Sequence, residues 1–162
     1  MLIFVQLALH SALLTTGHLV YDGLKFDIVI LSKEYIYLAQ PGGFPRSRLF
    51  QAAGVAGVDS VAPVYLGVAP WRNPEIGTRR LILVIGFDPR RATFTSTEIS
   101  ALLPQLKKTD TVMLDRHTRP EFGPQEKGLR AELGQRQVEV VGLYDMGTGF
   151  AAYGGTVSVD VN

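Results

Sequence analysis

The residues best suited to chemistry in this sequence form one polar cluster, Asp115-Arg116-His117, followed by Arg119 and Glu121. Histidine can act as a general base when a carboxylate orients its ring. On an extended chain Asp115 and His117 would point to the same side while Arg116 faces away. The cluster has no glycine elbow, no nucleophile at a known spacing and no second histidine nearby. We therefore predict a salt-bridged structural loop, and a hydrolase that uses His117 is the rival interpretation.

The sequence has few residues suited to binding a metal or a phosphate group, and none suited to thiol chemistry. The three histidines, His10, His18 and His117, are isolated, and no HExxH or EF-hand pattern is present. The segment Gly147-Thr148-Gly149 lacks the lysine of a phosphate-binding loop. The chain has no cysteine, which excludes disulfides and thiolate ligands. We therefore expect no catalytic residue, no cofactor and no metal ion.

The composition is typical of a folded domain without a nucleic-acid footprint. The chain has 162 residues, 46% of them hydrophobic, and a formal net charge of +1. This length suits one domain or two small subdomains with a real core. Between Arg46 and Arg91 there are seven arginines against Asp59, Glu75 and Asp88. They do not alternate with aromatic residues on one helical face, so we interpret them as solvated loop charges.

The most apolar stretch is residues 1–14, which Gln6 and His10 interrupt. It is shorter than the ~20 residues of a membrane span, and it lacks the basic start and the cleavage site of a signal peptide. From its residues alone it could be a buried helix or the outer end of a membrane helix. We expect this helix to end at Gly23.

The patterns after Gly23 predict an α+β fold. Ser96 is suited to cap a helix, which Pro104 should bend or end, and Gly134-Gln135 should form the turn of a hairpin. The unbroken apolar run at residues 81–85 is typical of a strand buried on both faces. The expected helices cover residues 45–53 and 97–106, and the expected strands cover residues 26–31, 58–68, 81–85, 111–114, 129–133, 137–144 and 150–161.

Six segments, spread in order over nearly the whole chain, carry a family resemblance. They are FDIVILSK (26–33), FPRSRLFQA (44–52), VDSVAPVYLGVAPWRNPE (58–75), LILVIGFDP (81–89), DRHTRPEFGP (115–124) and VEVVGLYDMGTGFAAYGGT (138–156). Together they resemble the extracytoplasmic, MacB-like periplasmic core domain of FtsX-like ABC exporter permeases, and among these the DevC type.

This resemblance implies a fold in two parts. A porter-like α/β subdomain would comprise residues 23–78 and 147–162, and an inserted β-rich subdomain would comprise residues 79–146. An N-terminal helix at residues 1–22 would precede them as the end of a truncated first transmembrane helix.

The resemblance also implies a function in transport and not in catalysis. The chain would be the periplasmic domain of an ABC exporter permease in the inner membrane. It would couple ATP-driven movement of membrane helices to a periplasmic adaptor protein, for export of an amphiphile such as a glycolipid. ATP hydrolysis is expected on a separate subunit, an outer-membrane channel would complete the exporter, and the permease is expected to be a homodimer.

Two loops carry residue types that are enriched in interface hot spots. We regard five of their residues as candidate adaptor contacts: Trp71, Arg72 and Arg79 in the first loop, and Arg116 and Arg119 in the second. The alternative for Trp71 is packing into the core. A rival function is a small-ligand module that binds a lipid or peptide in the cleft between the two subdomains.

Overall fold

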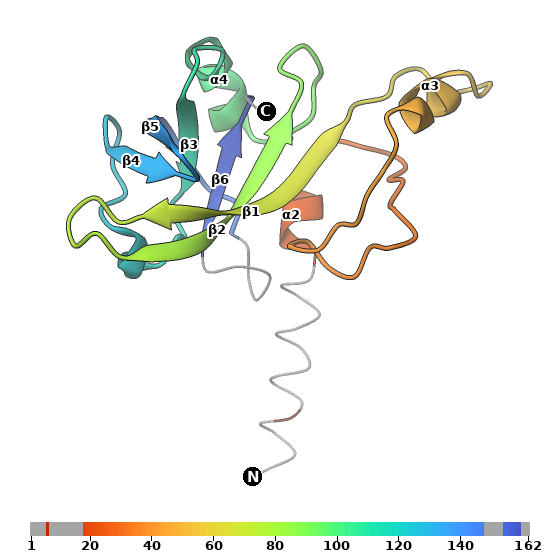
Figure 1. Cartoon of the computed structure of the whole chain (residues 1–162). Coiled ribbons are helices and arrows are strands. Elements are labelled where there is room, and N and C mark those ends of the chain that lie inside the picture. The colour runs from red at the N-terminus through yellow and green to blue at the C-terminus, as the bar shows by residue number, and fades with distance from the viewer. Residues whose placement is uncertain (1–5, 7–17, 148–153, 160–162) are drawn as a thin grey trace.

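The computed structural model describes residue 6, residues 18–147 and residues 154–159 (Figure 1). Helices and strands are mixed along this part of the chain, and its strands all belong to one sheet, which confirms an α+β fold. In chain order the elements are α2 (Leu19–Asp22), α3 (Ser47–Ala53), β1 (Val64–Arg72), β2 (Arg79–Phe87), α4 (Thr97–Leu106), β3 (Thr111–Asp115), the 3-10 helix η1 (Pro120–Phe122), β4 (Arg130–Leu133), β5 (Arg136–Tyr144) and β6 (Gly155–Ser158).

The described strands close into a small barrel in the order β1-β2-β6-β3-β5-β4. β1 and β2 form a hairpin that is paired over the whole length of both strands. β6 lies between β2 and β3, parallel to the first and antiparallel to the second. β3 runs parallel to β5, and β5 forms a hairpin with β4. The barrel closes where Trp71 and Arg72 of β1 pair with Leu133 and Glu132 of β4.

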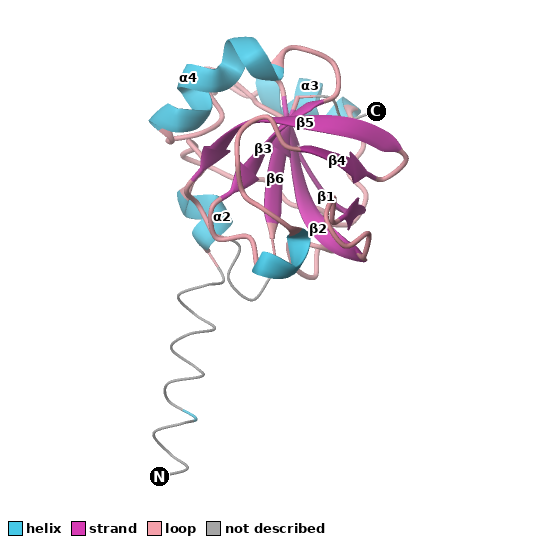
Figure 2. Cartoon of the chain, turned by 90° about the vertical axis from the view of Figure 1, so that its left-hand side faces the viewer, coloured by secondary structure: helices cyan, strands magenta, loops and turns pink. Residues whose placement is uncertain are grey.

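The two faces of this sheet carry two separate hydrophobic clusters, because side chains alternate along each strand. On β2, Ile82 belongs to one cluster, whereas Leu83 and Ile85 belong to the other. The inner cluster, on the face turned into the barrel, includes Trp71 and Phe122. The outer cluster includes residues of α2 and α4, and Figure 2 shows these helices together on one side of the strands.

The subdomain boundary expected between residues 78 and 79 does not divide this sheet. It falls in the turn of the β1–β2 hairpin, whose two strands are fully paired with each other. β6, which was expected in the first part, lies between β2 and β3, which were expected in the second. Strands that were expected in the two parts therefore pair with one another in one sheet, and the division into two subdomains stays a prediction.

Several local predictions are confirmed. Ser96 caps α4, and its Oγ accepts a hydrogen bond from the backbone N–H of Ile99 at 3.4 Å. β4 and β5 form the expected hairpin, with Gly134 at a φ of 65° in the turn, a conformation that glycine adopts at little cost. Pro104 lies inside α4, and the helix continues past it to Leu106.

The expected strand at residues 26–31 is wrong for the described structure, in which these residues belong to neither a helix nor a strand. Ile28 and Ile30 are 80% and 58% exposed. The strand expected at residues 58–68 begins only at Val64. β-branched residues favour extended backbone, but this preference depends on packing against neighbouring strands.

Of the two helices near the N-terminus, α2 contributes the buried Val20 to the outer cluster, whereas α3 contributes no buried residue. No residue of α3 is buried, so the predicted apolar face of Leu49, Phe50 and Ala53 is not packed against the core. Residues 1–22 lie mostly outside the described residues. Within the described part, α2 ends at the C-cap Gly23. Within the part of the chain that the structure describes, no helix is long and apolar enough to span a bilayer.

Candidate partner-binding surface

The two loops that were expected to bind a partner contact each other in the structure. The indole Nε1–H of Trp71 donates a hydrogen bond to the carbonyl oxygen of Phe122 at 2.9 Å. Next to it, the side-chain amide of Asn73 donates to the carbonyl oxygen of Glu121 at 3.0 Å. Segments that are about fifty residues apart in sequence therefore form one unit, residues 71–80 and 119–123, which we call the hairpin–η1 unit.

Trp71 is fully buried within this unit, so the prediction that it contacts a partner directly is wrong. Its ring belongs to the inner cluster together with Phe122, and its only polar group is satisfied by the carbonyl oxygen of Phe122. Indole combines a large apolar surface with one hydrogen-bond donor. The side chain therefore anchors η1 against the hairpin.

Asn73 organises the turn between β1 and β2. Its side chain is 3% exposed, and its Oδ1 accepts hydrogen bonds from the backbone N–H groups of Glu75 at 2.9 Å and Ile76 at 3.3 Å. Asparagine commonly folds the backbone in this way. Gly77 follows with a φ of 72°, and its N–H donates to the carbonyl oxygen of Asn73 at 2.9 Å. The turn thus holds Ile76, 68% exposed, at its tip.

Arg72 and Arg79 lie opposite each other on one face of the hairpin. Both pair with Glu132 of β4, at 3.3 Å and 2.8 Å respectively. Glu132 is largely buried while both arginine side chains are more than half exposed. The single carboxylate of Glu132 pairs with two guanidinium groups, so these three side chains together keep a net positive charge. The two ion pairs also hold both arginines in defined positions.

Leu81 extends the same face of the hairpin, because it follows Arg79 by two residues. It is 60% exposed, so the prediction that the apolar run at residues 81–85 is buried on both faces fails at its first residue. Pro70, directly opposite Leu81, is exposed as well. We call the exposed residues of this face and of the turn the hairpin patch: Pro70, Arg72, Ile76, Arg79 and Leu81.

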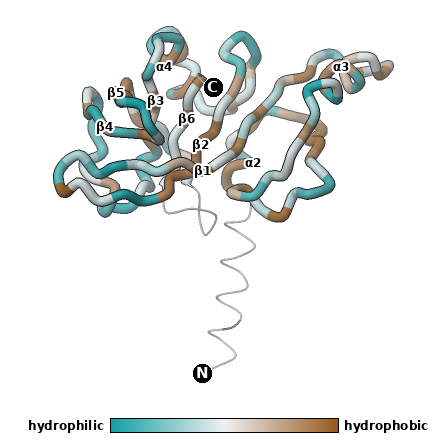
Figure 3. Tube along the Cα trace, viewed as in Figure 1, coloured by the Kyte–Doolittle hydropathy of each residue, from teal (hydrophilic) through white to brown (hydrophobic). Residues whose placement is uncertain are grey.

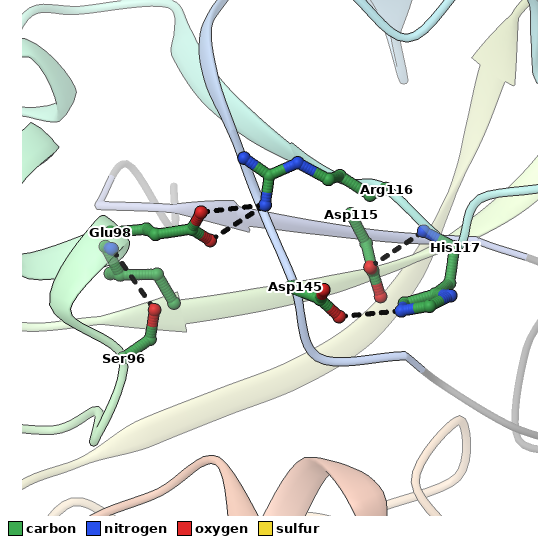
Figure 4. Close-up of polar contacts among 7 residues, drawn as sticks. Ser96, Glu98, Asp115, Arg116, His117 and Asp145 are labelled. Atoms are coloured by element: carbon green, nitrogen blue, oxygen red, sulfur yellow. Dashed lines mark hydrogen bonds and ion pairs between the residues drawn. The ribbon is translucent and has the colours of Figure 1, made fainter.

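Of the other two candidate contacts, only one belongs to the hairpin–η1 unit. Arg119 is exposed and directly precedes η1. Arg116 instead reaches α4, where its guanidinium contacts both carboxylate oxygens of Glu98 at 2.8 Å and 2.9 Å (Figure 4). The structure therefore brings Arg72, Arg79 and Arg119 into one unit and places Arg116 against α4.

Asp115 and His117, the pair that suggested acid–base chemistry, do not lie as a carboxylate that orients a histidine ring. Asp115 is buried, and its carboxylate accepts hydrogen bonds from the backbone N–H groups of His117 at 3.0 Å and Gly147 at 2.7 Å. Burial raises the pKa of Asp115 above its ordinary value. The His117 ring instead contacts Asp145 at 2.6 Å, and both side chains are largely exposed (Figure 4).

This arrangement offers little for catalysis. A general base needs a positioned substrate within hydrogen-bond reach, and His117 lines neither of two cavities found among the described residues. Among residues 18–147 and 154–159, no group of histidine, aspartate and glutamate side chains could hold a metal ion. The carboxylate of Asp115 therefore links the end of β3 to the segment after β5 through its hydrogen bonds.

The main described cavity is the open mouth of the barrel and not a cleft between subdomains. It has a volume of about 310 Å³. One wall is β1 from Tyr65 to Ala69, and the opposite wall includes Val112 of β3 and Val138 of β5. The expected cleft between two subdomains is replaced by this mouth because strands of both parts share one sheet.

Sequence reasoning missed the residues that build this surface. Asn73 is followed by Pro74 and, after two more residues, by Gly77, a pattern that signals a turn, but the pattern does not reveal the contact with η1. The role of Glu132 requires β4 to lie beside β1, which depends on pairing between distant strands. Leu81 is exposed because it lies near the start of β2, close to the hairpin turn, and the sequence pattern does not give this position.

No family model matches this sequence, and no curated protein matches it. Among solved structures, the chain is similar to the extracellular domain of the noncanonic ABC-type transporter YknZ from Gram-positive bacteria, with 16% sequence identity and a TM-score of 0.45. The match covers 70% of this chain and 61% of that domain's chain.

Proposed function

We propose that the chain is the extracytoplasmic domain of an ABC exporter permease of the DevC type, and that its hairpin patch binds a periplasmic adaptor protein. The six ordered sequence segments support the assignment to this class of permease. The observation that supports a binding role is the hairpin patch, where two positioned arginines flank exposed apolar side chains.

The composition of this patch suits a protein interface. Arginine is enriched at the interfaces of protein complexes, and apolar side chains at the interface centre contribute most of the binding energy. The patch is also held in place, since Trp71 and Asn73 tie the hairpin to η1. A rigid scaffold beneath exposed residues lowers the entropy that is lost on binding.

In this proposal the domain makes and breaks no covalent bonds. Movement of membrane helices, driven by ATP hydrolysis on a separate subunit, would be passed through the domain to the adaptor. The permease would act as a homodimer in the inner membrane, with this domain in the periplasm, and an outer-membrane channel would receive the exported amphiphile, for example a glycolipid. Such coupling requires a domain with two positions that the nucleotide state biases.

The test is binding of the matching periplasmic adaptor protein, measured by surface plasmon resonance at two salt concentrations. Leu81→Ala should weaken binding by about 1–2 kcal/mol if Leu81 lies at the interface centre. Arg79→Ala should mainly slow association and reduce its dependence on salt. Arg91→Ala is the matched control, because Arg91 is exposed beyond the opposite end of β2.

Two results would contradict the proposal at different levels. If Leu81→Ala and Arg79→Ala are folded and bind as the wild type does, the interface lies elsewhere on the domain. If the wild-type chain does not bind the adaptor at all, its role in adaptor coupling is wrong. Circular dichroism of each variant separates both results from unfolding.

A further inference from the structure

One edge of β1 lacks a strand partner over most of its length. β1 is paired with β2 throughout, but on its other edge β4 pairs only with Trp71 and Arg72. The carbonyl oxygen of Pro70 accepts from the N–H of Gly134 at 2.7 Å, so it points toward this second edge. Val68 and Leu66 share its orientation, because backbone groups alternate along a strand. Their N–H and C=O groups therefore face an edge that no described strand covers.

The barrel mouth lies beside this free edge. On β1, Tyr65, Gly67 and Ala69 line it from the inner face. A Cβ atom added at Gly67 would meet no atom within 4 Å. The mouth is thus a mainly apolar slot whose side wall is a free strand edge, with Asp110, Thr111, Arg136 and Ser158 also in its lining. A free strand edge beside side-chain pockets is the combination that binds an extended peptide by strand addition.

The chain also carries a strand-forming segment that pairs with no strand among the described residues. Residues 26–31 have the sequence FDIVIL, rich in the residue types that favour strands. Phe26, Ile28 and Ile30 are 45%, 80% and 58% exposed, and Val29 and Leu31 on the alternate face are 45% and 43% exposed. Figure 3 shows hydrophobic stretches along the part of the chain that contains this segment. Exposed apolar residues that are contiguous in this way commonly mark an interaction site.

The segment is tethered at both ends on the side of the outer cluster. Before it, the N–H of Lys25 donates to the carbonyl oxygen of Thr93 at 2.8 Å. After it, the hydroxyl group of Tyr35 accepts from that of Tyr21 in α2 at 2.7 Å, and Leu38 is buried in the outer cluster. In the described structure none of residues 26–31 lines the mouth of its own chain.

Figure 1 agrees with this separation, since residues 24–63 run to the right of β1 whereas β3, β4 and β5 lie to its left. We propose that residues 26–31 of one molecule add to the free edge of β1 in a second copy, with Phe26, Ile28 and Ile30 filling its barrel mouth. The free edge and the segment match in length, each being about six residues. Reciprocal insertion would give a closed dimer with two-fold symmetry.

Single-cysteine variants test this contact directly, because the natural chain has no cysteine. Ile28→Cys and Gly67→Cys are prepared separately in the full chain, mixed and oxidised. We expect a disulfide-linked heterodimer as the main product, identified by mass spectrometry of the unreduced peptides. Ile36→Cys, 72% exposed but outside the segment, is the matched control and should give at least tenfold less cross-linking with Gly67→Cys.

Sedimentation of the full chain tests the assembly without a cross-link. Ile28→Asp disables the segment and Gly67→Phe fills the mouth, so each variant should be monomeric at concentrations where the wild type is a dimer. An equal mixture of the two should form a heterodimer with one filled mouth. The disulfide experiment provides a readout that does not depend on the folding of Gly67→Phe.

Four outcomes would overturn the proposal. Equal cross-linking by Ile28→Cys and the control Ile36→Cys would show that the contact is not specific. A double Ile28→Cys/Gly67→Cys variant that closes its disulfide within one monomer would show that each chain fills its own mouth. A wild type that stays monomeric would show that the proposed dimer does not form. A dimer that survives both Ile28→Asp and Gly67→Phe would place the interface elsewhere.

Discussion

Asp115 shows how a buried residue can resemble a catalytic one in sequence. Its spacing from His117 suggested an oriented general base, but its carboxylate binds backbone N–H groups on either side of the loop. A buried carboxylate is stable when it accepts several such bonds. The sequence identified a polar loop correctly, but it could not show that the ring of His117 turns outward to Asp145.

The buried carboxyl group of Asp115 should make stability depend on pH in an unusual direction. Burial raises its pKa above the ordinary value of 3.8, so the folded protein binds this proton more tightly than the unfolded chain does. Its contribution to the free energy of unfolding should therefore fall as pH rises from 3.8 to the higher folded value. Most acidic residues in ion pairs give the opposite slope.

Urea unfolding of the wild type and of Asp115→Asn, at several pH values between about 4 and 7, measures this contribution. The stability of the wild type relative to the variant should decrease as the pH increases. Asp59→Asn, which alters an exposed carboxylate, is the control. Parallel pH profiles for the wild type and Asp115→Asn would contradict the assigned shift.

At the scale of elements, the β1–β2 hairpin is held against η1 by two buried side chains, Trp71 and Asn73. Sequence reasoning recognised Trp71 as either a core residue or an interface anchor, and the structure decides for the core. The two alternatives could not be separated from the sequence because the partner of the indole, the carbonyl oxygen of Phe122, lies 51 residues away.

Trp71→Phe should destabilise the fold by about 1–3 kcal/mol, because it leaves the buried carbonyl oxygen of Phe122 without a donor. The measurement is urea unfolding followed by circular dichroism, since Trp71 is the only tryptophan and fluorescence is lost with it. Tyr65→Phe, at a more exposed position of β1, should change stability by less than about 0.5 kcal/mol. A Trp71→Phe variant as stable as this control would show that the hydrogen bond does not hold the hairpin to η1.

Elements with local signals were predictable, and elements that depend on distant partners were not. The β4–β5 hairpin and α4 were predicted because a turn glycine and a capping serine act within a few residues. Residues 26–31 carry an equally clear strand pattern, yet no strand of the described sheet pairs with them. Strand propensity describes what a segment can form, and pairing decides whether it does so.

For the whole molecule, the main finding is that one sheet separates two cores. The sequence resemblance implied two subdomains, but the inner and outer clusters alternate residue by residue along β2. A pattern of apolar residues cannot reveal strand order, and the strand order is what makes these cores inseparable. We therefore expect the barrel and its covering helices to unfold together.

Leu83→Ala tests this cooperativity from the outer face. Leu83 is fully buried in the outer cluster, and its truncation should cost about 2–5 kcal/mol. Fluorescence of Trp71 reports on the inner cluster, whereas far-ultraviolet circular dichroism includes the helices outside. Both transitions should move to lower urea by the same amount. An unchanged fluorescence midpoint would instead indicate two independent units.

The place of β6 has a consequence for how the chain is made. β6 supplies the shared neighbour of β2 and β3, yet its residues, 155–158, leave the ribosome after those of every other described element. Until they emerge, β2 and β3 each present an uncovered edge, and such edges are prone to aggregate in incomplete chains. The sheet therefore closes only after β6 has emerged, which makes the nascent chain, more than the folded domain, the form that most needs protection by chaperones.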